Sequence, residues 1–368
     1  MIDGGRLDFA NQSLLYKKIK KDAICLSQPI TYGPHTIAAM HAVFSGTYGN
    51  RTGTNSYWST YQFNKEKFKI ISEYLHDEGY YTCADIVSDL VIPKQGLDEF
   101  KIHDEINDNL TTNHIEYIKR MNEKNEEGQN FFLYLQYSNI HTGIMNEVLK
   151  IYDNFSPEYF ENRNKNKERY GKLFKKSEEY LEKILNTIKE LKLDKNSIIL
   201  IMSDHGISIG EKIGERAYGA FCYDYTLRTF AYFLFPDTNP IEITQQVRTI
   251  DYMPTILDYL EIPFDKKFEE IDGESLLPLF NGQKVTEKFA YSETGNPLKE
   301  KAPPKESNTF SIRTSNWKLI FNQYNNTREL YDLKADPNEE CNLHGQNIEI
   351  EEKLWSEMQK IRFSKSRK

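Results

Sequence analysis

A short apolar run followed at once by polar residues, at positions 196–206, constrains the fold of this chain most strongly. The run Ile198 to Met202 is too short for an isolated helix and lacks the alternation of a half-exposed strand. It predicts a strand that is buried on both faces of a parallel sheet. Polar residues begin where this strand ends, in the order Asp204, His205, Gly206. Because open α/β sheets bind ligands beyond the carboxyl ends of their strands, this edge is the first candidate site.

The pair Asp204 and His205 offers a hard oxygen and a borderline nitrogen, which suit a divalent cation such as zinc or manganese. The structural alternative is that Asp204 caps the next helix and His205 packs in the core. Near the N-terminus, residues 1–6 are typical of the end of a strand followed by a glycine turn, and the strand itself is expected to be missing. Asp3 in this turn could supply a second carboxylate, although a lone Asp-Gly pair is usually only a turn signal.

The composition excludes several classes of protein. At 368 residues, with 39% hydrophobic and 28% charged residues, the chain is expected to form a soluble large domain plus a small one. No apolar run approaches the roughly 18 residues of a membrane span, and no signal peptide is visible. The four cysteines show no metal-site or redox spacing, which predicts reduced, buried thiols in a cytoplasmic protein. The net charge of -8, with acids and bases interleaved, argues against nucleic acid as the main partner.

A second candidate residue stands at the start of a predicted helix. Gly33-Pro34 ends an extended segment, Gly46 is the expected C-cap, and apolar residues recur between them at helical spacing: Ile37, Met40, Val43 and Phe44. Thr36 therefore lies at the helix N-terminus, where its simplest role is that of the N-cap. The same position offers free backbone N–H groups and the positive end of the helix dipole. These lower the cost of an alkoxide and can hold a phosphoryl or sulfuryl oxygen.

Several short blocks in order along the chain resemble the sulfatase branch of the alkaline phosphatase superfamily. They are Tyr48 to Gly53, Gly79 to Thr82, Gly96 to Phe100, Ser203 to Gly206, Asp251 to Asp258, Asp272 to Leu279 and Glu329 to Pro337. The resemblance implies an α/β fold with a three-layer, mostly parallel central sheet and a small antiparallel C-terminal subdomain. It also assigns one divalent metal ion (Mn, Zn or Ca) to Asp3, Asp204 and His205, and the nucleophile to Thr36.

The chain departs from the formylglycine sulfatases at the nucleophile. Those enzymes carry a cysteine that is oxidised to formylglycine, with a proline and an arginine at fixed offsets, whereas this chain has Thr36, Ala38 and Met40 at these places. A threonine resembles instead the phosphodiesterases, the phosphonate hydrolases and the phospho-group transferases of the superfamily. We therefore expect phosphodiesters or phosphonates to be cleaved first, sulfate esters second and phosphate monoesters last.

Further residues are assigned to the site by position. His141 follows a predicted strand at 129–141 and would bind an oxygen of the ester or protonate the leaving group, although such a histidine is often a surface residue. Tyr218 stands where relatives have His or Lys. The expected donors to the anionic ester are His35, His41, Lys212 and Arg216, and solvated loop charges are the alternative for the last two. No Asp-x-x-x-His pair follows this strand, so one metal is expected rather than two.

The rest of the pattern sets the domain organisation. Residues 167–193 predict a long amphipathic helix after a polar loop at 162–167, and residues 230–235 predict another strand. Residues 1–288 would form the catalytic domain. Residues 289–368 would form the small subdomain, with strands at 311–313, 317–321 and 328–331 and a closing helix at 349–361. The predicted function is metal-dependent hydrolysis of a small-molecule or glycan-linked anionic ester. A transferase and a binding protein that keeps the fold are the alternatives, and the oligomeric state stays open.

Overall fold

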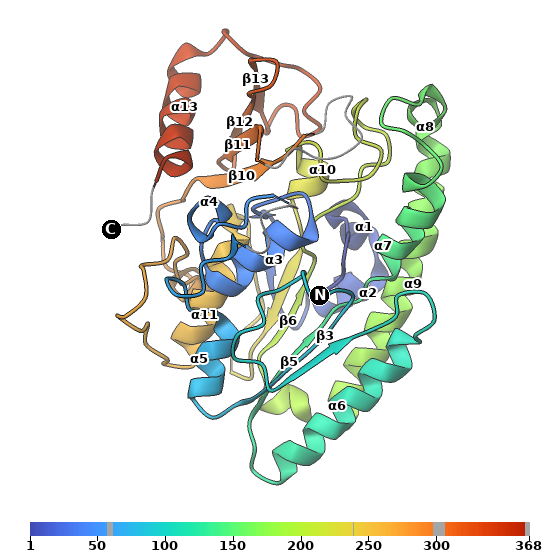
Figure 1. Ribbon diagram of the computed structural model, residues 1–368, viewed down its shortest axis with the longest axis vertical. Helices are drawn as coiled ribbons and strands as arrows, with labels where there is room; N and C mark the ends of the chain where they lie inside the picture. The colour runs from blue at the N-terminus through green and yellow to red at the C-terminus, as the bar shows by residue number, and fades with distance from the viewer. Residues whose placement is uncertain (57–61, 238, 297–305, 365–368) are drawn as a thin grey trace.

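The computed structural model of the chain describes residues 1–56, 62–237, 239–296 and 306–364 (Figure 1). Strands form the middle of the large domain. Helices α3, α5 and α11 cover one side of them, and the long helices α6 and α9 lie on the other. A separate antiparallel sheet with helix α13 stands at one end of the molecule. This arrangement confirms the predicted α/β fold with a small C-terminal antiparallel sheet.

The central strands fall into two larger sheets and a short pair. One sheet is parallel in the order β4 (Glu99–Ile102), β3 (Tyr81–Ile86), β5 (Phe131–Leu135). The other is mixed in the order β6 (Ile199–Met202), β7 (Ala231–Leu234), β1 (Ile24–Leu26), β8 (Ile241–Ile243). The pair β2 (Pro29–Ile30) and β9 (Val247–Arg248) is parallel. The strand predicted at 198–202 is present as β6, but its ladder with β7 is antiparallel, which corrects the prediction that it lies in a parallel sheet.

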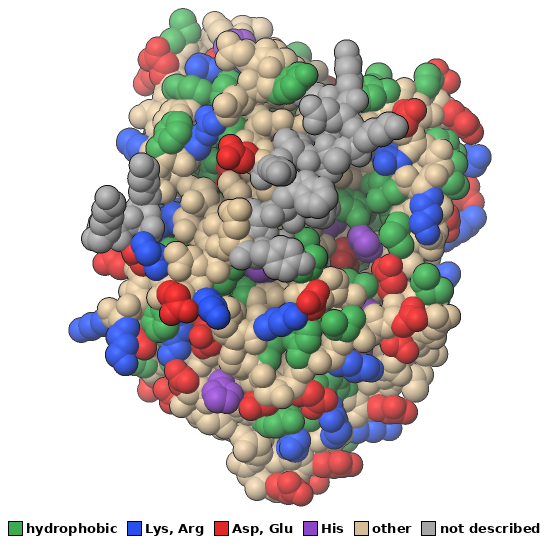
Figure 2. Space-filling view, viewed as in Figure 1, with side chains coloured by type: hydrophobic (Ala, Val, Ile, Leu, Met, Phe, Trp, Pro, Cys, Tyr) green, Lys and Arg blue, Asp and Glu red, His purple; other side chains and the backbone are tan. Residues whose placement is uncertain are grey.

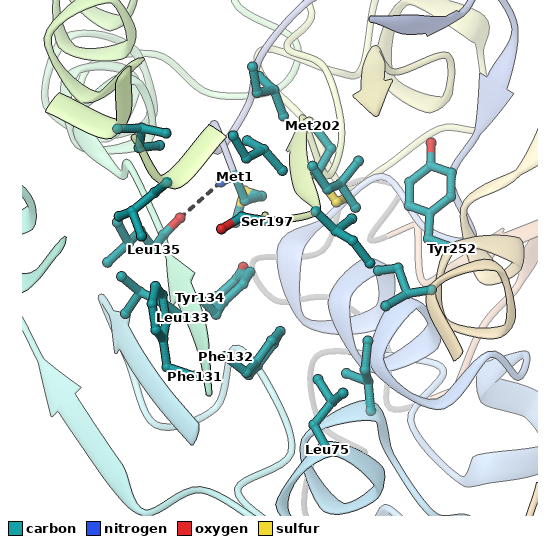
Figure 3. Close-up of a pocket in the computed structure, with 18 of the residues that line it drawn as sticks. Met1, Leu75, Phe131, Phe132, Leu133, Tyr134, Leu135, Ser197, Met202 and Tyr252 are labelled. Carbon is teal, nitrogen blue, oxygen red and sulfur yellow. Dashed lines mark hydrogen bonds between the residues drawn. The ribbon is translucent and has the colours of Figure 1, made fainter. Parts of the chain in front are cut away.

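The two larger sheets are separated by an apolar groove between β5 and β6, and the N-terminus lies at its end (Figures 1 and 3). Ile2 forms single parallel bridges to Tyr137 after β5 and to Ser203 after β6. Figure 3 shows the hydrogen bond of 2.9 Å from the Met1 amine to the carbonyl of Leu135. The groove holds about 400 Å³. Because the first half of β6 lines this groove, its residues are only half-buried, and burial on both faces was predicted wrongly for them.

The predicted helices are present with shifted ends. Helix α3 (Thr36–Ser45) ends at Gly46, whose φ of 60° is the left-handed C-cap that the sequence indicated. Helix α9 (Arg163–Glu190) packs its apolar stripe on α6 (Leu110–Glu126), and its first turns occupy most of the predicted polar loop. The other α-helices are α1 (Leu7–Gln12), α2 (Leu14–Ile19), α4 (Gly49–Thr52), α5 (Ile71–Asp77), α7 (Asn139–Ile144), α8 (Pro157–Glu161), α10 (Asp224–Leu227), α11 (Tyr252–Tyr259) and α12 (Leu277–Phe280).

The C-terminal sheet follows the sequence pattern closely. Its antiparallel strands are β10 (Ala290–Thr294), β11 (Thr309–Arg313), β12 (Trp317–Asn322) and β13 (Thr327–Asp332), and α13 (Ile348–Arg362) closes it. Its buried apolar residues include Phe310, Ile312 and Leu319, and the strand β11 is buried on both faces. The sheet begins next to the expected boundary at residue 289.

The surface agrees with the composition. Acidic and basic side chains are interspersed over the face in Figure 2, without a large patch of one sign. Among the described residues, no helix has the length and apolar character needed to cross a membrane. All four cysteines are free, and Cys25, Cys83 and Cys222 are buried. Cys341 is exposed, which corrects the prediction that all four would be buried.

Candidate active site

The N-terminal turn places Asp3 between the ends of β5 and β6. The Ile2 amide donates to Met202 at 2.8 Å, and the Asp3 amide donates to Tyr137 at 3.1 Å. Gly4 then adopts a φ of 71°, and its amide donates to Oδ1 of Asp204 at 3.1 Å. A Cβ at Gly5 would lie 2.8 Å from the ring of Phe230, so a larger residue would push the turn away. The glycines therefore serve the close approach that the sequence indicated.

Asp204 and His205 follow β6 and meet Asp3 in a buried cluster. His205 Nε2 lies 3.7 Å from Oδ1 of Asp3 and 3.5 Å from Oδ2 of Asp204. The other ring nitrogen, Nδ1, is 2.8 Å from the carbonyl oxygen of Gly206 and donates to it. This hydrogen bond fixes the tautomer, so the lone pair of Nε2 points towards the two carboxylates. The predicted trio is thus brought together in space, and the reading of Asp204 as a helix cap does not apply.

Thr36 joins this cluster from helix α3. Its Oγ1 lies 3.3 Å from Oδ1 and 3.4 Å from Oδ2 of Asp3, within hydrogen-bond distance of both. The same oxygen is 3.3 Å from His205 Nε2. The helix cap is His35, whose ring accepts from the Ala38 amide at 3.4 Å, so the expected capping role of Thr36 is wrong. The hydroxyl of Thr36 is therefore turned to the acidic cluster while its backbone starts the helix.

The donor set of Asp3, Asp204 and His205 fits a divalent cation. Burial, and next the charge of Asp204, raise the pKa of Asp3 to about 6. Oδ2 of Asp204 is fully buried and makes no hydrogen bond to the described residues. Two carboxylates and one inward imidazole nitrogen, all within 4.8 Å of one another, are the ligands expected for zinc or manganese. A cation here would compensate the buried negative charge.

His141 and Tyr218 border the cluster on its more open side. His141 lies in helix α7 rather than directly after a strand, and its side chain is 25% exposed. Burial alone would lower its pKa, but the neighbouring Glu105 carboxylate, 3.6 Å from Nδ1, and the charge of Asp3 raise it overall. The ring of Tyr218 lies 4.8 Å from that of His205 and 5.6 Å from that of His141. Tyr218 therefore belongs to the site.

Gln136 is a site residue that the sequence analysis did not single out. Its Nε2 donates to Oδ2 of Asp3 at 2.7 Å, and its Oε1 accepts from the Val87 amide at 3.1 Å. The side chain is fully buried. Its place directly after the apolar run of β5 matches that of Asp204 after β6, so the same strand-end argument could have indicated it.

The four proposed ester donors are placed differently. Burial lowers the pKa of His35 to about 3 and that of His41 to about 4, which keeps both neutral near pH 7. His41 Nε2 lies 3.1 Å from the Leu90 carbonyl. Lys212 donates to the Glu339 carbonyl and lies over the Tyr223 ring, and Arg216 donates to the carbonyls of Leu149 and Tyr152. These contacts direct His41, Lys212 and Arg216 away from Thr36, so their role as donors remains a prediction without geometric support.

The fold and this site define an α/β protein with a candidate metal centre beyond the ends of its strands, and comparison with known families identifies the family. Residues 9–262 match the sulfatase family, and residues 218–364 match the family of the C-terminal region of N-sulphoglucosamine sulphohydrolase. The chain therefore belongs to the sulfatase family. The first match includes Thr36, Asp204 and His205, and Asp3 lies just ahead of it.

Two curated relatives act on different sulfate esters by their names. The N-acetylglucosamine-6-O-sulfatase of Bacteroides thetaiotaomicron is 29% identical over 180 residues, which are 46% of this chain and 30% of the relative. The choline-sulfatase of Rhizobium meliloti is 26% identical over 172 residues, which are 45% of this chain and 30% of the relative. The matched stretch thus spans about a third of each relative's length.

Two solved structures share the fold over nearly the whole chain. A 2-O glycosaminoglycan sulfatase superposes with a TM-score of 0.77 at 17% identity, covering 98% of this chain and 91% of that one. A structure solved with its substrate D-glucosamine-2-N,6-O-disulfate gives a TM-score of 0.73 at 18% identity, covering 98% and 97%. At this identity the similarity confirms the fold.

Proposed function

We propose that this chain is a metal-dependent hydrolase of singly charged sulfuric or phosphoric esters, with Thr36 as the nucleophile. The observation that carries the proposal is the position of Thr36 Oγ1, 3.3 Å from both the Asp3 carboxylate and His205 Nε2. A hydroxyl beside a carboxylate that can accept its proton, at the N-terminus of a helix, is the arrangement of an activated nucleophile.

Asp3, Asp204 and His205 would hold the cation, whether Mn, Zn or Ca. When bound, a divalent ion supplies positive charge that lowers the pKa of a nearby hydroxyl and offsets a negative ester oxygen. Gln136 holds the Asp3 carboxylate in place, and the Gly4 amide does the same for Asp204. These hydrogen bonds fix the positions of the two carboxylates relative to Thr36.

Around the held cation, the proton transfers are carried out by this chain's own groups and water. Thr36 Oγ1 attacks the sulfur or phosphorus atom in line, its proton passes to the Asp3 carboxylate, and the bond to the leaving oxygen breaks. Protonated His141 donates a proton to that leaving oxygen, which departs as an alcohol. Water then attacks the sulfur or phosphorus atom and gives one proton to His141, while Asp3 returns its proton to the departing Thr36 oxygen, so the sulfuric or phosphorus acid is released and all three side chains regain their starting protonation. Tyr218, packed on both imidazoles, restricts their orientation.

Sulfate esters are the first candidate substrates because the named relatives are sulfatases. Since one relative is an N-acetylglucosamine-6-O-sulfatase and one similar structure holds D-glucosamine-2-N,6-O-disulfate as its substrate, a sulfated glycan fragment is the natural substrate to test. Phosphodiesters and phosphonates are the second candidate, and the residue that favours them is Thr36. A formylglycine hydrate can expel sulfate by collapsing to an aldehyde, whereas a threonine ester must be cleaved by water or another acceptor. The sequence-based order, with diesters ahead of sulfates, stays a prediction.

The test is a comparison of kcat/KM for p-nitrophenyl sulfate, bis-p-nitrophenyl phosphate, p-nitrophenyl phenylphosphonate and p-nitrophenyl phosphate on one purified preparation. Mass spectrometry after rapid quenching should find a sulfuryl or phosphoryl group on the peptide that contains Thr36. Thr36→Ser should keep activity and Thr36→Ala should lose it. Full activity of Thr36→Ala would overturn the nucleophile assignment. Assays with an added alcohol acceptor test for transfer. Metal binding without hydrolysis or transfer of any ester would favour the binding-protein alternative.

A further inference from the structure

A second buried cluster of metal-type ligands lies outside the candidate active site. Asp85 is near the end of β3, paired in register with Lys101 on β4 and Leu135 on β5. His103 follows β4, and its amide donates to the Ile86 carbonyl at 2.9 Å. His114 comes from the start of helix α6, which packs against β5. The side chains of Asp85, His103 and His114 are fully buried, and their ligand atoms lie within 4.8 Å of one another.

Each histidine has one ring nitrogen engaged by a hydroxyl and the other turned to Asp85. His103 Nε2 lies 2.9 Å from Oγ of Ser138, and His114 Nδ1 lies 2.8 Å from the hydroxyl of Tyr180. His103 Nδ1 donates a hydrogen bond of 2.6 Å to Oδ1 of Asp85, and His114 Nε2 lies 3.8 Å from Oδ2. If the His103 proton moves to Nε2, which then donates to Ser138, a lone pair at Nδ1 becomes free for a cation. Outer contacts of this kind orient histidine ligands in metal sites.

One atom of this cluster lacks the partner that buried polar atoms normally have. Nε2 of His114 is buried and makes no hydrogen bond to the described residues, whereas Oδ2 of Asp85 makes none either but is paired with the Lys101 ammonium at 3.3 Å. Because buried polar atoms are nearly always paired, an inward-facing imidazole nitrogen without a hydrogen bond indicates a missing ligand.

We propose that Asp85 together with Nδ1 of His103 and Nε2 of His114 forms a second divalent-cation site of the zinc class, with water as the fourth ligand. Nitrogen and carboxylate ligands about 2.0–2.1 Å from zinc lie roughly 3.4 Å apart in a tetrahedron. The observed separations of 2.6 and 3.8 Å bracket that spacing, so side-chain shifts of less than an ångström would complete the site.

Lys101 is the group that competes with a cation at this site. Its Nζ lies 3.3 Å from Oδ2 of Asp85, while its side chain is 42% exposed. The ammonium can therefore turn into solvent when a cation binds the carboxylate. A site made of one carboxylate and two neutral imidazoles leaves a net positive charge with a divalent ion, which is the usual balance of His-rich zinc sites.

The site would be structural and would support the candidate active site. His103 is hydrogen-bonded to Ser138, which directly precedes α7, the helix that carries His141. The Gln136 amide donates to the Asp85 carbonyl at 3.0 Å, and the Gln136 side chain holds Asp3. A cation that ties β3 and β4 to α6 would thus stiffen the supports of both His141 and Asp3.

The test counts metal ions in the full chain and its variants. After chelation and reloading with zinc, elemental analysis should find two ions in the unaltered chain, one in Asp204→Asn, one in His114→Gln and none in the double variant. Cobalt(II) loaded into Asp204→Asn should give the visible absorption of a tetrahedral site, and His114→Gln should abolish it. One ion in the unaltered chain and none in Asp204→Asn would overturn the proposal. One ion in the unaltered chain and one in Asp204→Asn would support the second site and would show that Asp204 does not hold the metal of the proposed function.

A second variant guards against a folding defect in His114→Gln. Lys101→Met removes the competing ammonium at the exposed edge of the cluster, so zinc should bind roughly tenfold or more tightly. A chromophoric chelator in competition measures this affinity in the Asp204→Asn background. Unchanged or weaker zinc binding by Lys101→Met would contradict the assignment of Asp85 as a ligand.

Discussion

The two buried clusters of this molecule distribute charge in opposite ways. Around His205, the carboxylates of Asp3 and Asp204 share one imidazole, and burial together with Asp204 raises the pKa of Asp3 to about 6. Around Asp85, two imidazoles share one carboxylate. Burial there would raise the pKa of Asp85, but the hydrogen bond of His103 and the neighbouring His114 hold it below its usual range. The first cluster therefore has two carboxylates for one imidazole, whereas the second has one carboxylate beside two imidazoles and the Lys101 ammonium.

The hydroxyl beside each cluster differs as well. Thr36 is only partly buried, and its oxygen lies within 3.4 Å of both the Asp3 carboxylate and His205. Ser138 is fully buried, and its oxygen lies 2.9 Å from the outward nitrogen of His103. A nucleophile needs both a proton acceptor and access to substrate, and only Thr36 has both. The comparison separates a cluster suited to chemistry from one suited to support.

The largest expected effect is the contrast between Asp204→Asn and Asp85→Asn. Asp204→Asn removes a ligand from the first cluster, so kcat/KM on the best ester should fall by about a thousandfold or more. Asp85→Asn should cost about tenfold or less, because it weakens a support and leaves the reacting groups in place. Kinetics at saturating metal, with thermal melts to check folding, measure both. Equal losses in the two variants would mean that the clusters act as one site.

The two hydroxyls give the next contrast. Thr36→Ala should lower kcat by about a thousandfold, because it removes the oxygen that is proposed to attack. Ser138→Ala removes one hydrogen bond to His103 and should change kcat by less than about tenfold. Thr36→Ser is the matched control and should retain turnover. A Ser138→Ala variant as inactive as Thr36→Ala would assign chemistry to the second cluster.

Gln136 connects the two clusters and should give an intermediate effect. Gln136→Leu removes the hydrogen bond to Asp3 but keeps the backbone bond to the Asp85 carbonyl. Activity and metal affinity at the first cluster should fall by about 10–100-fold, as is usual when a residue that hydrogen-bonds to a metal ligand is removed. The cobalt absorption assigned to the Asp85 cluster should be unchanged. Gln12→Leu, on an exposed amide that donates to Asp8, is the control and should have no effect.

The first cluster could be predicted because local signals mark its residues and the sulfatase resemblance assigns them together to a metal. An apolar run that ends in Asp204 and His205, and a glycine turn after Asp3, each indicate a strand end without knowledge of the partner strands. The Asp85 cluster has no such signal. His103 and His114 stand in separate elements, and only the parallel packing of β3 against β4 and the cover of α6 bring them to Asp85.

Some fold errors have the same physical origin. The sequence predicts a loop at the start of α9 because residues 163–167 carry no apolar spacing, yet Asn166 is buried there and donates to the carbonyls of Tyr159 and Ile209. The sequence also cannot distinguish parallel from antiparallel neighbours of β6, because an apolar run is the same in either orientation. Tertiary contacts decided each of these cases.

The smallest expected effect concerns the pH dependence that Glu105 gives to His141. Glu105 raises the pKa of His141, so the imidazole stays protonated to higher pH and can donate to the leaving oxygen there. Glu105→Gln removes this charge while keeping an amide near His141 and Thr142, so the alkaline limb of the kcat profile should move to lower pH. The acid limb should stay in place, because Asp3 is untouched. Glu116→Gln, outside the site on α6, is the control and should leave both limbs unchanged. A shift of the acid limb, or no shift at all for an ester with a poor leaving group, would show that His141 is not the proton donor. Water would then be the group that protonates the leaving oxygen.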